Sequence, residues 1–263
     1  MKIKQIRNAT NRIEYAGTTF LVDPWLMPKH QFSFSDIPGM PYHTPDSIKE
    51  HLVMPFYALP ESMESILSGV DYYVVTHLHP DHIDMYMDGT VGAPLDKSVP
   101  VICQNEADAE VFRKSGFQDV TVLSKNGQVF GKTTLTNVPA RHGTVIPCGD
   151  VMGMVFQAEG EKTLYLAGDT VWYEGVEQNL STYHPEVIML NACAAETVEN
   201  GRLIMDDEEV ACVAKAAPKA SLYLTHFNNV AHAAISRHEM RAHLLRRNVT
   251  SYVLPEDGEC VEF

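Results

Sequence analysis

Thr76-His77-Leu78-His79-Pro80-Asp81-His82 is the most informative stretch of this chain. It directly follows residues 70–75 (VDYYVV), a short run of β-branched and aromatic residues that predicts a buried strand. Three imidazoles and one carboxylate therefore stand close together where a strand ends. Neutral imidazole and carboxylate are the ligands that borderline divalent cations such as zinc prefer. The stretch predicts a metal site.

The spacing within this stretch leaves room for two metal ions. His77 and His79 alternate along an extended chain, so both rings leave the same face. Asp81 and His82 come after Pro80, which bends the chain and lets them approach from a second direction.

This H-x-H-x-D-H pattern at a strand end resembles the signature of the metallo-β-lactamase fold superfamily. The resemblance covers nearly all of the chain and implies an α+β fold, a four-layer αββα sandwich. The region Thr225-His226-Phe227-Asn228 and the compact length are most similar to the ascorbate-6-phosphate-lactonase-like, metal-dependent hydrolase branch. His79 at the second position differs from the branch with a diiron oxygen-reducing centre, which carries Glu there.

The order of predicted elements agrees with two sheets packed face to face, with helices on the outer faces. Strands are expected at residues 3–7, 12–15, 18–22, 70–75, 99–103, 119–123, 133–138, 150–158, 162–167, 185–190, 220–225, 252–254 and 259–263, and helices at 61–68, 105–115, 206–217 and 236–247. No linker divides the chain, so residues 1–263 are expected to form one domain.

Residues 26–60 form an inserted loop rich in proline and aromatic residues. A long segment without periodicity inside a compact domain is usually functional or disordered, and the aromatic content argues against disorder. We expect either a wall or lid over the metal site or an oligomer interface.

Composition limits the partners. Asp and Glu outnumber Lys and Arg by 34 to 20, which gives a net charge of −14. A surface this acidic repels phosphodiester polymers, so a nucleic acid is not expected. No apolar run reaches the length of a membrane span, and the first residues lack the apolar core of a signal peptide. Five scattered cysteines without a C-x-x-C motif are typical of a reduced compartment, so we expect a cytoplasmic protein. We also expect it to bind a small-molecule substrate, and a homo-oligomer is possible.

Three further strand ends carry residues that could bind a metal, namely His142, Asp169 and His226. A single histidine at a strand end is more often structural. The superfamily resemblance implies that His77, His79 and His142 hold one metal and that Asp81, His82 and His226 hold the other, with Asp169 as the bridge. The cofactor would be two divalent ions, zinc first, with manganese or iron as alternatives.

Two metal ions about 3.5–4 Å apart can share a water and lower its pKa towards neutrality. The predicted function is therefore hydrolysis of a small ester-like bond, in a lactone or a phosphodiester, by a metal-bridging hydroxide. Asp81, also an expected ligand, and His232 are the candidate catalytic residues, and Asn8, Arg141 and Asn191 are candidate substrate-binding residues. An iron-loaded oxidoreductase and a non-catalytic metal-binding module remain the alternatives.

Overall fold

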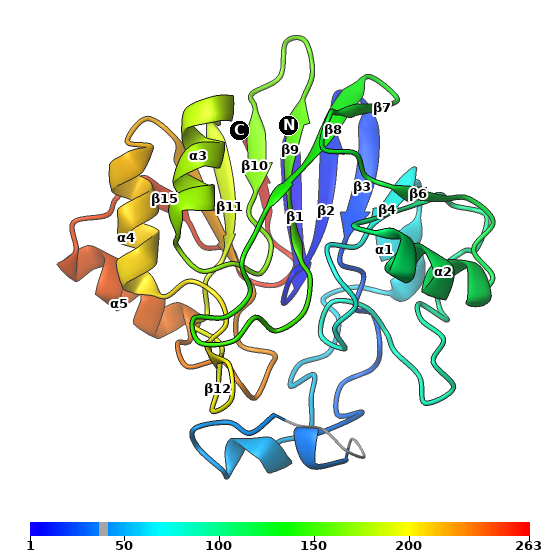
Figure 1. Ribbon diagram of the computed structural model, residues 1–263, viewed down its shortest axis with the longest axis horizontal. Helices are drawn as coiled ribbons and strands as arrows, with labels where there is room; N and C mark the ends of the chain where they lie inside the picture. The colour runs from blue at the N-terminus through cyan, green and yellow to red at the C-terminus, as the bar shows by residue number, and fades with distance from the viewer. Residues whose placement is uncertain (37–41) are drawn as a thin grey trace.

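The computed structural model describes residues 1–36 and 42–263, and it places two seven-stranded mixed sheets face to face with helices on both outer sides (Figure 1). The predicted αββα sandwich is confirmed. Part of the predicted loop 26–60, residues 37–41, lies outside the described residues.

The first sheet has the strand order β16-β1-β2-β3-β4-β5-β6. Its strands are β1 (Lys2–Arg7), β2 (Thr10–Tyr15), β3 (Thr18–Val22), β4 (Tyr72–Val74), β5 (Val101–Cys103), β6 (Val120–Val122) and β16 (Cys260–Glu262). β3 to β6 are parallel neighbours, whereas β16, β1, β2 and β3 pair antiparallel.

The second sheet has the order β15-β14-β11-β10-β9-β8-β7. Its strands are β7 (Gln128–Phe130), β8 (Thr133–Pro139), β9 (Met152–Gln157), β10 (Leu164–Leu166), β11 (Val187–Asn191), β14 (Ser221–Thr225) and β15 (Tyr252–Val253). A separate hairpin pairs β12 (Glu196–Thr197) with β13 (Gly201–Arg202).

Five α-helices cover the outer faces of the described structure. They are α1 (Met63–Leu67), α2 (Glu106–Lys114), α3 (Glu174–Tyr183), α4 (Asp207–Ala216) and α5 (Arg237–Arg246). α1 and α2 pack on the first sheet, and α3 to α5 pack on the second. None of the helices in residues 1–36 and 42–263 combines the length and apolar character needed to span a bilayer.

Alternation of side chains along the strands builds the layers, because successive residues of a strand point to opposite faces of its sheet. On β11, Val187 and Met189 enter the core between the two sheets, whereas Ile188 and Leu190 pack under the helices. On β3, Phe20 points to the same central core. Each sheet is therefore apolar on both faces, as a buried layer of a four-layer sandwich must be.

The carboxyl ends of the parallel strands meet at one edge of the sandwich, where loops converge (Figure 1). Such edges are where open α/β sheets build their sites. Residues 26–36 and 42–60, here called the excursion, extend below this edge. They contain two short 3-10 helices, η1 (Phe34–Asp36) and η2 (Lys49–His51). Phe32 and Met54 join the two arms of this excursion through a pair of backbone hydrogen bonds.

Candidate metal centre

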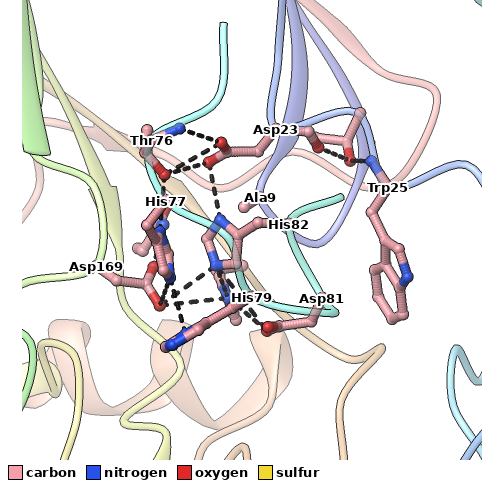
Figure 2. Close-up of polar contacts among 12 residues, drawn as sticks. Ala9, Asp23, Trp25, Thr76, His77, His79, Asp81, His82 and Asp169 are labelled. Carbon is pink, nitrogen blue, oxygen red and sulfur yellow. Dashed lines mark hydrogen bonds and ion pairs between the residues drawn. The ribbon is translucent and has the colours of Figure 1, made fainter. Parts of the chain in front are cut away.

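The seven side chains that the sequence singled out as ligands converge at the sandwich edge. Figure 2 shows five of them, His77, His79, Asp81, His82 and Asp169. His77, His79, Asp81 and His82 follow β4, His142 follows β8, Asp169 follows β10 and His226 follows β14. Most are buried, with His82 and His226 fully inaccessible to solvent.

One group of donors comes from His77, His79 and His142, whose ligand atoms all lie within 4.8 Å of one another. Nε2 of His77 is 2.9 Å from Nδ1 of His79. Three imidazole nitrogens around one point are a common set of protein ligands for a zinc-like ion.

A second group comes from Asp81, His82 and His226. Nε2 of His226 lies 3.2 Å from Oδ2 of Asp81 and 3.2 Å from Nε2 of His82. Two imidazoles and a carboxylate again offer a borderline divalent cation the donors it prefers.

Asp169 stands between the two groups. Its Oδ2 is 3.3 Å from Nε2 of His82 and 3.9 Å from Nε2 of His226 on one side. On the other side it is 3.7 Å from Nε2 of His142 and 4.0 Å from Nε2 of His77. One carboxylate oxygen thus faces imidazoles of both groups.

Asp23, which directly follows β3, orients the ring of His82 directly and that of His77 through Thr76 (Figure 2). Its Oδ2 is 2.8 Å from Nδ1 of His82, and its Oδ1 accepts the backbone N–H of Thr76 at 2.8 Å. Oγ1 of Thr76 lies 3.0 Å from Nδ1 of His77. Because Nδ1 of each ring is engaged, Nε2 is directed into the cluster, which is how ligating histidines are usually oriented.

Hydrogen bonds from outside the cluster also orient His142 and Asp169. Nδ1 of His142 lies 3.0 Å from the carbonyl oxygen of Leu203. The side-chain amide of Asn191 donates to Oδ1 of Asp169 at 2.5 Å, which leaves Oδ2 for the cluster. Outer partners of this kind set ligand direction.

Electrostatics within the cluster favour bound positive charge. Burial alone would lower the pKa of His82, but the neighbouring carboxylates, Asp169 first, outweigh it and raise that pKa to about 10. Burial also opposes the charge on Asp169, yet the imidazoles, His82 first, hold the pKa of its carboxyl well below the usual value. Burial lowers the pKa of His79 to about 3. Charged carboxylates beside imidazoles that hold protons only through those carboxylates fit divalent cations, which replace protons at such sites.

The backbone at the strand ends is shaped for this convergence. Gly168, directly before Asp169, has φ +68°, and a Cβ there would lie 2.6 Å from the carbonyl oxygen of Met152. Asn8, Asp23 and His226 also have positive φ, although they are not glycines. Residues held in this region cluster at functional sites, where the surrounding structure must stabilise them.

A cavity of about 710 Å³ opens over the cluster. Its floor includes His79, Asp81, His142, Asp169 and His232, and its walls are mostly apolar: Met27, Phe32, Phe34, Tyr42, Leu78, Met85, Tyr86, Met87 and Leu203. Among the described residues that line it, none is Lys or Arg, and residues 37–41 contain neither type.

Residues 18–227 match the family model described as a beta-lactamase superfamily domain. The chain belongs to this superfamily. The relatives of this beta-lactamase superfamily member include UPF0173 protein YddR of Bacillus subtilis, 38% identical over 268 residues and covering all of both chains. A UPF0173 metal-dependent hydrolase of Koribacter versatilis is 29% identical over 199 residues, 72% of this chain and 71% of its own.

Two solved structures are similar over the whole length of this superfamily member. One, described as a possible metal-dependent hydrolase from Veillonella parvula, has a TM-score of 0.88 and 34% identity, and the match covers 99% of this chain and 98% of its own. The other, an isothiocyanate hydrolase from Delia radicum gut bacteria, has a TM-score of 0.89 and 32% identity, with 100% and 99% covered. The chain is a metal-dependent hydrolase of the metallo-β-lactamase superfamily.

His232, predicted as a catalytic residue, lies at the cavity of this hydrolase. Its Nε2 is 3.7 Å from Oδ2 of Asp81, and its ring packs against Phe34 with centroids 5.3 Å apart. Its Nδ1 is buried without a hydrogen-bond partner among the described residues.

The three predicted substrate-binding residues do not line the cavity. Asn8 is fully buried, and its amide nitrogen lies 3.0 Å from the carbonyl oxygen of Asp81 and 3.2 Å from Nε2 of His226. The amide of Asn191 is engaged by Asp169. Both amides contact predicted ligands, and the role of these residues in binding substrate stays a prediction.

Arg141 is exposed, and its role in binding substrate stays a prediction. Its backbone supports the site. Its N–H donates to Oγ1 of Thr170 at 2.9 Å, and its carbonyl oxygen accepts the N–H of Val171 at 2.9 Å. These bonds join the loop that carries His142 to the loop that carries Asp169.

Sequence reasoning did not single out the turn Met85-Tyr86-Met87, which forms one wall of the cavity. Its signal was available, because three large apolar residues begin three positions after His82 and directly precede the turn residues Asp88 and Gly89. Exposed apolar residues of this kind are a mark of binding surfaces.

Proposed function

We propose that this hydrolase is dinuclear. His77, His79 and His142 would hold one divalent ion, Asp81, His82 and His226 the other, and Asp169 would bridge them. The convergence of Oδ2 of Asp169 on imidazoles of both groups supports this assignment. Two such ions, when bound, lower the pKa of a shared water and so supply a hydroxide nucleophile near neutral pH.

The substrate we propose is a small neutral molecule with an electrophilic carbon. One observation supports this choice: the cavity walls are mostly apolar, and no Lys or Arg is among the described residues that line the cavity. A phosphodiester needs cations around its charged oxygens, whereas a neutral carbon centre needs fewer of them. Of the two bond types expected from sequence, the lactone therefore fits this cavity better than the phosphodiester.

An isothiocyanate meets the same conditions and is our first candidate, because the structural neighbour described as an isothiocyanate hydrolase is 32% identical over the full chain. In the balanced reaction, R–N=C=S and one water give R–NH₂ and carbonyl sulfide. A carbon–oxygen bond forms to the water oxygen, the carbon–nitrogen bond breaks, and both water hydrogens end on nitrogen.

His232 is the residue we propose for handling the nitrogen of this substrate. Its imidazole lines the cavity beside Asp81, and its buried Nδ1 lacks a partner within residues 1–36 and 42–263. Buried polar atoms are nearly always paired, so an unpaired one at a cavity is available to a ligand. The imidazole can hydrogen-bond the atom that becomes the leaving amine.

The test is turnover by purified protein reconstituted with zinc, manganese or iron. Methyl and benzyl isothiocyanates, a γ-lactone and bis(4-nitrophenyl) phosphate are compared under identical conditions. We expect hydrolysis of the neutral substrates, with amine and carbonyl sulfide released in equal amounts from the isothiocyanates. Removal of metal with a chelator should abolish turnover, and re-addition should restore it. Preference for the phosphodiester would contradict the substrate assignment.

A further inference from the structure

The cavity wall formed by Met85, Tyr86 and Met87, here called the 85–87 wall, has a rigid backbone. It caps a tight turn in which the N–H of Tyr86 donates to the carbonyl oxygen of Thr90 at 3.0 Å, and the N–H of Gly89 donates to that of Tyr86 at 2.9 Å. Met85 also forms a β-bridge with Val91. The side chains of the wall therefore project from a fixed frame.

The base of this turn is anchored in the protein core. Ile83 is fully buried and Val91 is 1% exposed, both in the cluster beneath α1 and α2. The fold of the turn thus depends on residues that flank the wall, and the wall itself adds little to packing.

The wall side chains remain exposed although they are large and apolar. Met85 is 37% exposed, Tyr86 43% and Met87 85%. Burial of apolar side chains is favourable, and part of this free energy is not realised in the free protein. All three side chains line the metal cavity, so a molecule bound there would cover them.

A second apolar surface faces the same cavity from the excursion. Met27, Phe32 and Phe34 line it, and Phe34 also packs on His232. The space over the ligand cluster is therefore bounded by thioether and aromatic groups from two separate segments. Thioethers and aromatic rings attract one another and adapt to apolar ligands of different shape.

We propose that the 85–87 wall binds the non-reacting group of the substrate and makes the enzyme selective for arylalkyl over small alkyl isothiocyanates. This inference rests on the proposed function, because it places the reactive carbon at the metal cluster. The wall begins three residues after His82, so a substrate whose carbon reaches the cluster brings its organic group against the turn. Rejection of charged groups follows from the apolar surroundings.

The experiment compares Met87→Ala and Tyr86→Ala with wild type on methyl and 2-phenylethyl isothiocyanates. We expect wild type to prefer the 2-phenylethyl compound in kcat/KM, and each substitution to reduce that preference about tenfold, mainly through KM. Leu245→Ala on α5, a residue 73% exposed and outside the cavity lining, is the matched control and should leave both activities unchanged.

A second readout does not depend on turnover. 2-Phenylethyl azide keeps a linear three-atom group but is not hydrolysed, and its Kd is measured by calorimetry. The two wall variants should bind it about tenfold more weakly than wild type and Leu245→Ala.

The outcomes separate the two proposals. If no isothiocyanate is hydrolysed but the azide binds and the wall variants weaken it, the proposed function fails and the apolar subsite stands. If isothiocyanates are hydrolysed with equal losses on both substrates in the variants, the wall assignment is overturned. A wall variant that changes only the oligomeric state, measured by sedimentation, would instead assign these side chains to an interface between copies and also overturn it.

Discussion

At the scale of single residues, the direction of a side chain matters as much as its presence. The amide of Asn191 donates to Oδ1 of Asp169, and this bond keeps Oδ2 within 4.0 Å of four imidazole nitrogens. Without the bond, the carboxylate can rotate away from the position between the two donor groups. Asn191 therefore acts as a positioning residue for the proposed bridge.

We predict that Asn191→Ala weakens metal affinity by about 10- to 100-fold while the fold is retained. Competition with a chromogenic chelator measures the affinity, and circular dichroism checks the fold. Asn126→Ala, at an exposed asparagine, is the matched control and should bind metal like wild type. An unchanged affinity in Asn191→Ala would show that Asp169 does not depend on this donor.

The predictability of the site from sequence also differs from residue to residue. The ligands between His77 and His82 could be predicted because they are contiguous and follow a strand. His142, Asp169 and His226 lie far apart, and only the superfamily resemblance grouped them. The roles of Asn8 and Asn191 could not be read from sequence, because an amide at a strand end can face substrate or ligand equally well.

At the scale of elements, the turn after β10 depends on a glycine. Gly168 has φ +68° and no room for a Cβ against the carbonyl oxygen of Met152. Gly160, in the turn before β10, has a similar φ of +78° but nothing within 4 Å of its Cβ position. The pair separates backbone strain, which both share, from steric clash, which only Gly168 has.

We predict that Gly160→Ala costs on the order of 1–2 kcal/mol of unfolding free energy, from strain alone. Gly168→Ala should cost more and should also lower metal content, because the clash displaces Asp169. Urea denaturation and elemental analysis measure the two effects. Equal losses of stability with full metal content in both variants would contradict the role of this turn.

The excursion is tied to the β12–β13 hairpin by His43 and Glu199. The N–H of Val198 donates to the carbonyl oxygen of His43 at 2.7 Å, and Nδ1 of His43 lies 2.5 Å from Oε1 of Glu199. The hydrogen bond to Glu199 raises the pKa of His43, and the same bond lowers the pKa of Glu199. This contact therefore depends on pH.

We predict that the contact is strongest in mildly acid solution. Because the pKa of His43 is raised, its contribution is complete below the ordinary histidine value of 6.5 and is lost as pH rises through the raised value. At the acid end, the contact is lost as pH falls through the lowered pKa of Glu199, because the carboxylate is then protonated. The amide protection factor of Val198, measured by hydrogen exchange, should fall as pH rises from the ordinary histidine value through the raised pKa of His43.

Glu199→Gln is the control for this pH dependence. It removes the carboxylate and should make the protection factor of Val198 low and nearly constant over the same range. A protection factor that stays constant in wild type would show that the ion pair does not hold the excursion.

Some elements escaped prediction for physical reasons. α3 begins at Glu174 after Tyr173, which makes no side-chain cap, and it ends at His184 in the left-handed region rather than at a glycine. The usual start and stop signals are therefore absent. β12 and β13 have two residues each, too few for a period to be recognised. The longer strands and the helix at 236–247, which begins with a capping box at Ser236 and Glu239, were predicted correctly because their local signals agree with the fold.

At the scale of the whole molecule, the two sheets share one central core. Tyr15 on β2 donates to the carbonyl oxygens of Phe156 at 3.1 Å and Lys162 at 2.8 Å, both in the second half of the chain. The terminal amine of Met1 pairs with Glu161 at 2.8 Å. These contacts support our proposal that residues 1–263 form a single domain with an inserted loop at 26–60.

We predict that both halves unfold together. Trp25 and Trp172, the two tryptophans of the chain, come from its first and second halves and pack in the same hydrophobic cluster. In Trp172→Phe the fluorescence follows Trp25, and in Trp25→Phe it follows Trp172. Within each variant, the fluorescence and far-UV midpoints in urea should coincide. Separate midpoints would divide the chain into two independently stable units.

The most direct test of the dinuclear centre is elemental analysis of the reconstituted and desalted protein. We predict close to two divalent ions per chain for wild type, and fewer than two for both His77→Ala and Asp169→Ala, because one removes a ligand of the first ion and the other removes the bridge. One ion or none in the wild-type protein, or two ions retained in either variant, would contradict the ligand assignment on which the account depends.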